Sequence, residues 1–440
     1  MQDVLTNYER EISYSNVDPT LSFKLGKSSD VIKERRSMKI AVEQGAAKYE
    51  QNDTIRFKIG GDFIDSESLY FTCEYEQSVI NGGSADVTGG VASDGKCRPP
   101  NGIAGLIQEV RIRSGTGVEL ETIRHQNLLH HVLINYSHTP NHMNTIHQMA
   151  GGGAKTMNDS TGEVDHVATR PMGEAAATKE TFSFHIVSGL LNCGKLLPVS
   201  MLRGLVIELV LDTNANVLCA ANGATPTYEI TNPKICYDNI VVSESYRKSL
   251  LMFVAQNQYI PIGFTSYAHQ QNQHNSDAQT LQFDRSVSRL KDVISVFRAA
   301  SKVNDADIDS LETYAQLKNA GGNWRYMIGS QSYPVSGVEH PAEAYREALK
   351  VFGRHKNCEC GNVSFAQFKN GLGIIATDLE KSIGVFGSGE KTAANPSLSL
   401  VLNNVFETPA TSAATNMVCD HFMHHECLLR ISNGYVERLI

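Results

Sequence analysis

The chain has 440 residues, about three times the length of a typical domain, so we expect two domains or one large one. Hydrophobic residues make up 41% of the sequence, enough for a substantial core, and charged residues make up 20% without a block of one sign, which argues against disorder. The net charge of −8 and the pI near 6.0 argue against a nucleic-acid coat held by a basic surface. We interpret the one compact basic run, KERRSMK at 33–39, as a solvated face.

Cysteine usage and the absence of apolar stretches indicate the compartment. Nine widely scattered cysteines do not have the spacing of a disulfide framework. The opening residues MQDVLTNYEREIS lack the apolar stretch of a secretory signal, and no segment is long and apolar enough to cross a membrane. We expect a protein kept in a reducing compartment, where the sequons at Asn52, Asn135, Asn158 and Asn362 stay unmodified.

Strand patterns begin after a polar start. Residues 1–48 lack a steady period, and we expect them to form an N-terminal arm. In TIRFKIGGDF, from Thr54, and SLYFTCEYE, from Ser68, apolar residues alternate with polar ones, which predicts two strands. The glycine-rich and serine-rich stretch that follows is too polar to be core, and it predicts a loop.

Residues 107–123, IQEVRIRSGTGVELETI, predict a hairpin with a three-residue loop at 115–117. That register gives one apolar face and one face of opposite charges, each cross-strand pair contributing about 1 kcal/mol at most. The predicted pairs are Ile112 with Leu120, Arg113 with Glu119 and Arg111 with Glu121.

A helix is expected over RHQNLLHHVLINYS, residues 124–137, because its apolar residues recur at helical spacing. A polar excursion over 137–180 follows, and a loop of that length is usually functional or an assembly element.

Six of the fifteen histidines lie between residues 125 and 147. We disfavour a metal site there, because Pro140 breaks the helix between His138 and His142 and no acidic residue lies between Arg124 and Met157. Imidazoles at a subunit contact, where they could respond to pH, are the favoured interpretation.

Further elements follow in chain order. Strands are expected within 181–213, as a strand pair in TYEITNPKICYDNIVVS from Thr227, and a short helix in SESYRKSLLMFV from Ser243. The second half has strand patterns at 259–270, 288–299 and 321–334, and helix patterns at 306–318 and 340–355. In the last of these Pro341 suits the first turn and Gly353 can end the helix.

The chain ends in a predicted hairpin, CLLRISNGYVERLI, whose turn is Asn433-Gly434. A two-residue loop there pairs Ile431 with Val436 and Arg430 with Glu437. Because strands and helices do not alternate, a parallel α/β fold is excluded, and two antiparallel sandwiches or barrels in tandem fit best.

Three stretches approach known site motifs without matching them. In GVFGSGEKT, residues 384–392, Glu390 separates the last glycine from the lysine that a phosphate-binding loop needs next to it. Cys358 and Cys360 have the wrong spacing for a zinc finger. In CDHFMHHEC, from Cys419, a strand would put Cys419, His421, His425 and Cys427 on one face, which we interpret as packing or interface polarity rather than a metal site.

No nucleophile elbow and no H-E-x-x-H motif occurs in the sequence. We therefore predict no catalytic, cofactor-binding or metal-ligating residue, no cofactor and no enzymatic activity.

The order of elements over most of residues 100–440 resembles that of the double jelly-roll major capsid proteins of small eukaryotic DNA viruses, such as polinton-like viruses and virophages. The stretches that carry the resemblance are SGLLNCGKLLPVSMLRGLVIELVLDTNA, YEITNPKICYDNIVVSESY, SRLKDVISVFRA, NWRYMIGSQSYPVSGVEHPAEAYREALKVFGRH and CLLRISNGYVERLI. Residues 1–50 and the histidine-rich stretch do not contribute to the resemblance.

The resemblance implies an all-β fold of two tandem eight-stranded antiparallel jelly rolls with a few short inserted helices. It divides the chain into an arm at 1–48, a first jelly roll at 49–255 and a second at 256–440. It implies a major capsid protein of the virion that forms homotrimers with a hexagonal outline, which tile an icosahedral shell. Penton and minor capsid proteins are then the expected partners, without sequence-specific nucleic-acid binding.

Two other interpretations remain open. A β-sandwich surface protein that binds a ligand or carbohydrate would need a pocket of clustered aromatic residues, but the one tryptophan, Trp324, lies in a predicted strand. A cupin-like metalloenzyme would need inward-facing histidine and glutamate ligands on adjacent strands. Only His185 in FSFHIV is placed for that role, and it lacks an H-x-H partner.

Overall fold

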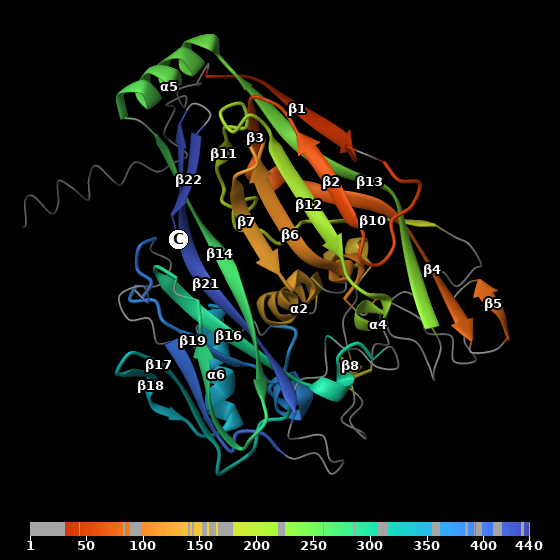
Figure 1. Ribbon diagram of the computed structural model, residues 1–440, viewed down its shortest axis with the longest axis vertical. Coiled ribbons are helices and arrows are strands. Elements are labelled where there is room, and N and C mark those ends of the chain that lie inside the picture. Colours follow the sequence, from red (N-terminus) through yellow and green to blue (C-terminus); the bar gives the residue numbers. More distant parts are fainter. Residues whose placement is uncertain are drawn as a thin grey trace, which may run out of the picture.

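The computed structural model (Figure 1) shows two stacked β-structures with few helices. It describes residues 31–43, 45–81, 84–88, 99, 101–139, 141–142, 145–151, 156–157, 164–165, 179–218, 225–257, 259–285, 287–305, 311, 315–353, 361–382, 386–390, 392, 398–407, 416–432 and 435–439.

The first half of the chain forms two facing sheets. The larger sheet contains β1 (Ile32–Ala41), β13 (Thr225–Val242), β3 (Phe63–Asp65), β4 (Tyr70–Asn81), β10 (Glu180–Phe184) and β11 (Leu196–Leu197), with β5 (Ser84–Thr88) on β4. The smaller sheet has the order β2 (Thr54–Ile59), β12 (Leu205–Leu211), β6 (Ile107–Ser114) and β7 (Glu119–Arg124).

The second half repeats this arrangement. One sheet has the order β14 (Ile260–His274), β21 (Met417–Ser432), β16 (Leu290–Ala299) and β19 (Ile375–Asp378), with β22 (Tyr435–Leu439) on β21. The other has the order β15 (Ala278–Phe283), β20 (Leu398–Asn403), β17 (Asn323–Ile328) and β18 (Gln331–Val338).

Both halves have the strand order of a jelly roll. In the second half, the first, eighth, third and sixth strands of the chain order form one sheet, and the second, seventh, fourth and fifth form the other. The first half follows the same rule when β3 and β4 count as its third strand and β10 and β11 as its sixth. The predicted tandem of two antiparallel jelly rolls is therefore confirmed.

Helices lie between and beside the strands. They are α2 (Gln126–Ser137), α4 (Asn214–Val217), α5 (Glu244–Asn257), α6 (Pro341–Val351) and α7 (Phe365–Gln367), with the π-helical η6 (Phe368–Leu372) and the short 3-10 helices η2 (Ser66–Ser68), η3 (Ile103–Leu106), η4 (Ile146–Ala150) and η5 (Ala300–Lys302). The short strands β8 (Thr156–Met157) and β9 (Val164–Asp165) pair antiparallel. No helix among the described residues is long and apolar enough to cross a membrane.

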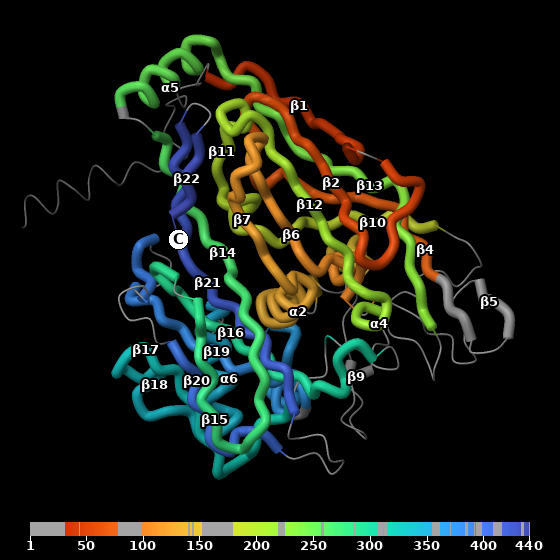
Figure 2. Tube along the Cα trace, in the orientation of Figure 1, coloured from red at the N-terminus to blue at the C-terminus, as the bar shows by residue number. Residues whose placement is uncertain are grey.

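The two apolar cores do not follow the boundary predicted between residues 255 and 256. The core of the first jelly roll includes Ile262 and Phe264 of β14 and Leu429 of β21, which come from the second half of the chain. Figure 2 shows why, since β14, β21 and β22 extend from the lower body up beside the first jelly roll. The α2 residues Leu128 and Val132 in turn belong to the core of the second jelly roll.

Part of the predicted arm is a strand. Residues 1–30 lie outside the described part of the chain, but Ile32–Ala41 forms β1 and pairs along β13. Its side chains are almost all exposed, which confirms the interpretation of the basic run as a solvated face. Arg35 forms ion pairs with Asp65 at 2.8 Å and Asp238 at 2.7 Å.

The strand pair predicted from Thr227 is wrong. The segment is one strand, β13, whose register on β4 shifts between Thr231 and Lys234. Asn232 lies in this irregularity with a φ of 52°, in the left-handed region that asparagine tolerates better than most residues. The bulge interrupts the alternation of apolar and polar residues. The prediction interpreted this interruption as a turn between two strands, but the chain continues in the same direction.

The two predicted hairpins have different outcomes. At the C-terminal end, Ile431 pairs with Val436 and Arg430 with Glu437, as predicted. In the β6–β7 hairpin, Arg113 pairs with Glu119 as predicted, but a bulge then shifts the register. Ile112 therefore pairs with Glu121, and Arg111 pairs with Thr122. The other two predicted pairs are wrong.

The helix predicted over 306–318 falls mostly outside the described residues. At its end, residues 315–317 are not helical, and Leu317 forms a β-bridge with Phe406. The helices predicted at 124–137, 243–254 and 340–355 are confirmed as α2, α5 and α6.

Candidate functional site between the two jelly rolls

Helix α2 lies where the two jelly rolls meet (Figure 1). The Tyr136 hydroxyl donates a 2.5 Å hydrogen bond to the carbonyl oxygen of Leu372 in the second half. The Tyr136 ring stacks on Phe352 with centroids 5.2 Å apart. Helix α2, which the sequence predicts from local apolar spacing alone, therefore connects the two jelly rolls.

Glu121 is a buried carboxylate at the same contact. The bulge in the β6–β7 hairpin leaves both Leu120 and Glu121 fully buried, so one apolar and one charged side chain point inward in succession. Glu121 accepts hydrogen bonds from the hydroxyls of Ser188 and Ser266 and from the backbone N–H groups of Gly189 and Leu190. These donors compensate for the loss of hydration that burying a carboxylate requires.

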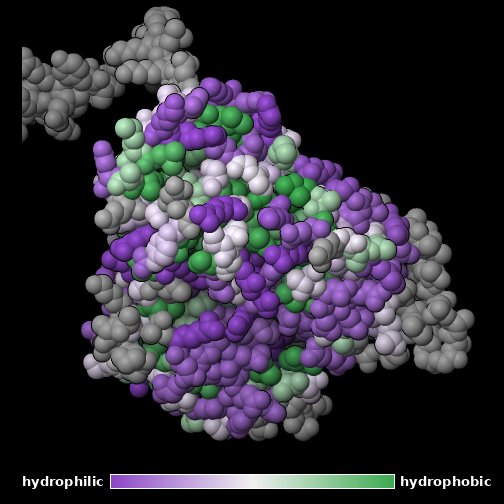
Figure 3. Space-filling view, turned by 45° about the horizontal axis from the view of Figure 1, so that its top comes forward, coloured by the Kyte–Doolittle hydropathy of each residue, from purple (hydrophilic) through white to green (hydrophobic). Residues whose placement is uncertain are grey.

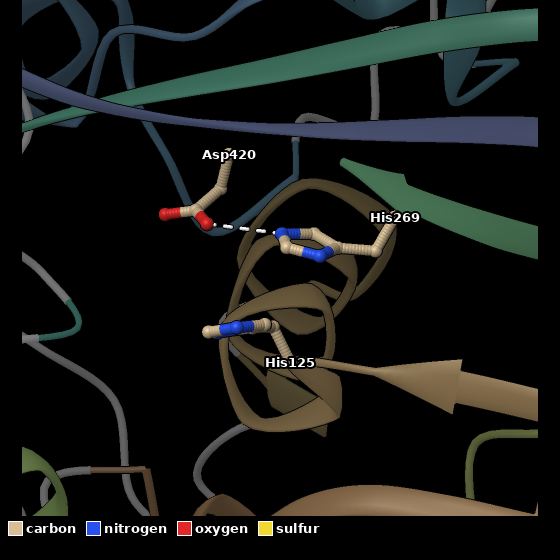
Figure 4. Close-up of side chains that lie close together, drawn as sticks. All are labelled: His125, His269 and Asp420. Atoms are coloured by element: carbon tan, nitrogen blue, oxygen red, sulfur yellow. Dashed lines mark hydrogen bonds and ion pairs between the residues drawn. The ribbon is translucent and has the colours of Figure 1, made fainter. Parts of the chain in front are cut away.

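His125, His269 and Asp420 come together from three elements (Figure 4). His125 follows β7 and precedes α2, His269 belongs to β14, and Asp420 belongs to β21. His269 Nε2 lies 2.9 Å from Asp420 Oδ1, and the rings of His125 and His269 have centroids 4.3 Å apart. One potential ligand atom from each residue lies within 4.8 Å of the others.

A buried cation accompanies this cluster. The Arg298 guanidinium donates a 2.7 Å hydrogen bond to Asp420 Oδ2, and Gln271 Nε2 donates to Oδ1 at 3.0 Å. Burial by itself would raise the pKa of Asp420, but the His269 hydrogen bond and the Arg298 charge hold it well below its ordinary value. Asp420 is therefore a carboxylate anion at neutral pH.

The histidine stretch of residues 125–147 does not form one site. His131 Nδ1 contacts the Asn101 side chain, and the rings of His138 and His142 stack with centroids 4.0 Å apart. His130 is buried, and burial lowers its pKa to about 4. Within the described parts of the chain, His125 is the one member of the stretch that belongs to a cluster of three potential metal ligands.

The cysteine–histidine strand has a packing role. His421 and His425 lie buried in β21, with His421 Nδ1 2.6 Å from the Ser295 hydroxyl oxygen. Cys419 and Cys427 are also buried. The face predicted to hold all four residues is therefore in the interior, and no three of them meet as a ligand cluster in the described structure.

The remaining predicted positions that the structure describes lie apart from the His125–His269–Asp420 cluster. Trp324 is buried in β17, as predicted, and His185 is exposed instead of facing the interior. The prediction for Cys358 and Cys360 lies outside the described residues. In the glycine-rich segment, the Gly387 N–H donates to Glu426, which agrees with a loop inside a sandwich.

Apolar side chains are exposed on α5. Those with more than a third of their surface exposed are Tyr246, Leu251, Met252 and Phe253, and Met252 reaches 67%. Figure 3 shows hydrophobic surface gathered at the end of the molecule where α5 projects. Exposed apolar clusters on a folded protein indicate interaction surfaces.

Comparison with known proteins identifies the fold through structure alone, because no protein-family model and no curated protein matches the chain. The Faustovirus major capsid protein superimposes with a TM-score of 0.62 at 10% identity, over 96% of this chain and 94% of that one. A chain of the Sputnik virophage structure gives 0.58 at 12% identity, over 96% and 92%. A chain of the PBCV-1 virus capsid gives 0.57 at 12% identity, over 95% and 99%. The chain therefore shares, over nearly its whole length, the double jelly-roll fold of these viral capsid structures.

Proposed function

We propose that the protein is a major capsid protein of a DNA virus, which forms homotrimeric capsomers in the icosahedral shell of the virion. The observation that carries this proposal is the repeated jelly-roll strand order along one chain, together with its match to the Faustovirus major capsid protein over 96% of this chain. We divide the chain into jelly rolls at 49–255 and 256–440 and add β1 to the first.

A tandem of jelly rolls suits this role physically. Two similar jelly rolls in one chain give a trimer six similar units around a three-fold axis, and therefore a nearly hexagonal outline that tiles a shell. The acidic net charge of −8 is consistent with a shell protein that does not neutralise the genome itself. We expect a penton protein and minor capsid proteins to complete the particle.

We further propose that the exposed apolar face of α5 contacts a neighbouring copy of the chain. Stable subunit contacts usually bury more than about 1,200 Å² in total and have an apolar centre. Leu251 and Met252 supply such a centre on a surface that is otherwise costly to leave in water.

A structural role explains the site residues better than the two alternatives. The buried Trp324 is not available as a stacking platform for a carbohydrate. The exposed His185 does not point into the jelly roll, where a cupin-like metalloenzyme would need its ligands.

The decisive test is the mass of the purified full chain by light scattering, with negative-stain images of the same peak. The chain is 48.2 kDa, so a trimer has about three times that mass. A trimer of hexagonal outline is expected, and a stable monomer at micromolar concentration contradicts the proposal. The variant Met252→Glu should weaken the trimer, whereas Glu244→Gln at the start of the same helix should leave it intact.

A further inference from the structure

We propose that His125, His269 and Asp420 bind one divalent cation of the zinc type at the contact between the two jelly rolls. Two imidazoles and one carboxylate are a common ligand set for Zn²⁺, with the fourth position taken by water. The proposal goes beyond the capsid role and does not depend on it.

His125 lies beside the hydrogen-bonded pair of His269 and Asp420 without being part of it. Asp420 and His269 already satisfy each other at 2.9 Å, so their contact does not require a second imidazole. The His125 side chain has no hydrogen-bond partner among the described residues, yet its ring lies against His269. A metal ion would give the His125 ring a bond that the protein groups around it do not provide.

The backbone holds His125 in this position at a cost. Its φ is 50°, in the left-handed region, where residues other than glycine are strained. It occupies the N-cap of α2 without making a side-chain capping bond. The imidazole thus lies beside the His269 ring and does not cap the helix.

The charges around His125 favour a cation. Two carboxylates, Asp420 and Asp212, and one guanidinium group, Arg298, act on His125, so the negative groups exceed the positive ones by one.

The surroundings also resemble those of a metal site. Arg298 and Gln271 hydrogen-bond to Asp420, and ligating carboxylates are usually oriented by such outer contacts. His125 is only partly buried, which leaves an entry path beside the buried His269 and Asp420. Binding would replace the His269–Asp420 hydrogen bond by two bonds to the ion, and the His269 ring would then carry its proton on Nδ1.

The first experiment measures zinc in the full-length protein. Purified protein is loaded with excess Zn²⁺, dialysed against metal-free buffer and analysed by mass spectrometry of the element, with thermal unfolding recorded in parallel. We expect about one zinc per chain and a higher melting temperature with zinc than after chelation.

The variant His125→Asn isolates the proposed ligand, because asparagine accepts the left-handed backbone and the Asp420–His269–Arg298 contacts remain. It should lose the zinc and the zinc-dependent rise in melting temperature while keeping the fold by circular dichroism. His125→Asp should recover zinc binding, because it restores a ligand atom. His340→Asn, an exposed histidine elsewhere in the second jelly roll, is the matched control and should bind zinc like the parent.

Two results overturn the proposal. One is a parent protein that retains no stoichiometric zinc after dialysis. The other is equal zinc in the parent and in His125→Asn, which would assign the metal to other groups. Neither result bears on the mass of the trimer, so the capsid proposal is tested separately.

Discussion

The carboxylate of Glu121, in the first jelly roll, accepts a 2.7 Å hydrogen bond from the hydroxyl of Ser266, in the second. Glu121 is inside because the β-bulge at Leu120 turns it toward the neighbouring jelly roll. A residue that a regular hairpin would expose therefore becomes part of the contact that fixes how the two domains sit together.

Replacing this carboxylate should destabilise the protein strongly. Glu121→Ala leaves two hydroxyls and two backbone N–H groups buried without their acceptor, so we expect a loss of about 3 kcal/mol in the free energy of unfolding. Urea unfolding followed by circular dichroism measures it. Glu119→Ala, on the exposed end of the same strand, should change stability by less than about 0.5 kcal/mol. Similar losses for the two variants would contradict the assigned role of Glu121.

The close approach at Gly189 should be just as sensitive. A Cβ at this position would overlap the carbonyl oxygen of Thr265 in β14, which is backbone and cannot turn aside. Gly189→Ala should therefore cost about 3 kcal/mol or more and lower the melting temperature. Gly60→Ala is the control, because a Cβ there meets nothing within 4 Å. If Gly189→Ala melts like the parent, the two jelly rolls are not packed as described.

The Tyr136 hydroxyl should contribute as one buried interdomain hydrogen bond. Tyr136→Phe keeps the stacking on Phe352 but removes the donor to Leu372, so we expect a loss of about 1 kcal/mol. Tyr435→Phe, at a side chain that is 64% exposed, should have no measurable effect. A chemical-denaturation midpoint distinguishes the two variants, and an unchanged midpoint for Tyr136→Phe would count against the contact.

Acid should weaken the fold through its buried histidines. Burial lowers the pKa of His130, His421 and His425 to about 4, 3 and 4, below the unfolded value near 6.5. The unfolded chain therefore binds protons that the folded chain does not, and stability falls as pH drops from about 6.5 toward 4. Each histidine should lower the free energy of unfolding by roughly 1 kcal/mol for each pH unit in this window.

The variant His130→Leu tests this linkage. Between pH 6.5 and 4, the unfolding free energy of this variant should depend less steeply on pH, because unfolding takes up about one proton fewer. Val132→Ala, on the same helix, should lower stability at every pH without changing the slope. An unchanged slope in His130→Leu would mean that this ring is protonated in the folded state.

The sequence by itself determined the elements whose signal is local. The alternation of apolar residues in β2, β12 and β17, the cap signals of α6 and the pairing of Ile431 with Val436 depend on neighbours a few residues apart, and the corresponding predictions are confirmed. The order of these elements was enough to anticipate two jelly rolls in one chain.

Only the tertiary structure decided what depends on distant residues. The sequence does not reveal that the bulge at Leu120 turns Glu121 inward, because a glutamate opposite Arg111 equally suits the charged face of a regular hairpin. The histidine stretch itself contains no carboxylate, for a different reason. The carboxylate beside His125 is Asp420, from the opposite end of the chain, and the strand pairing of β14 with β21 brings it there.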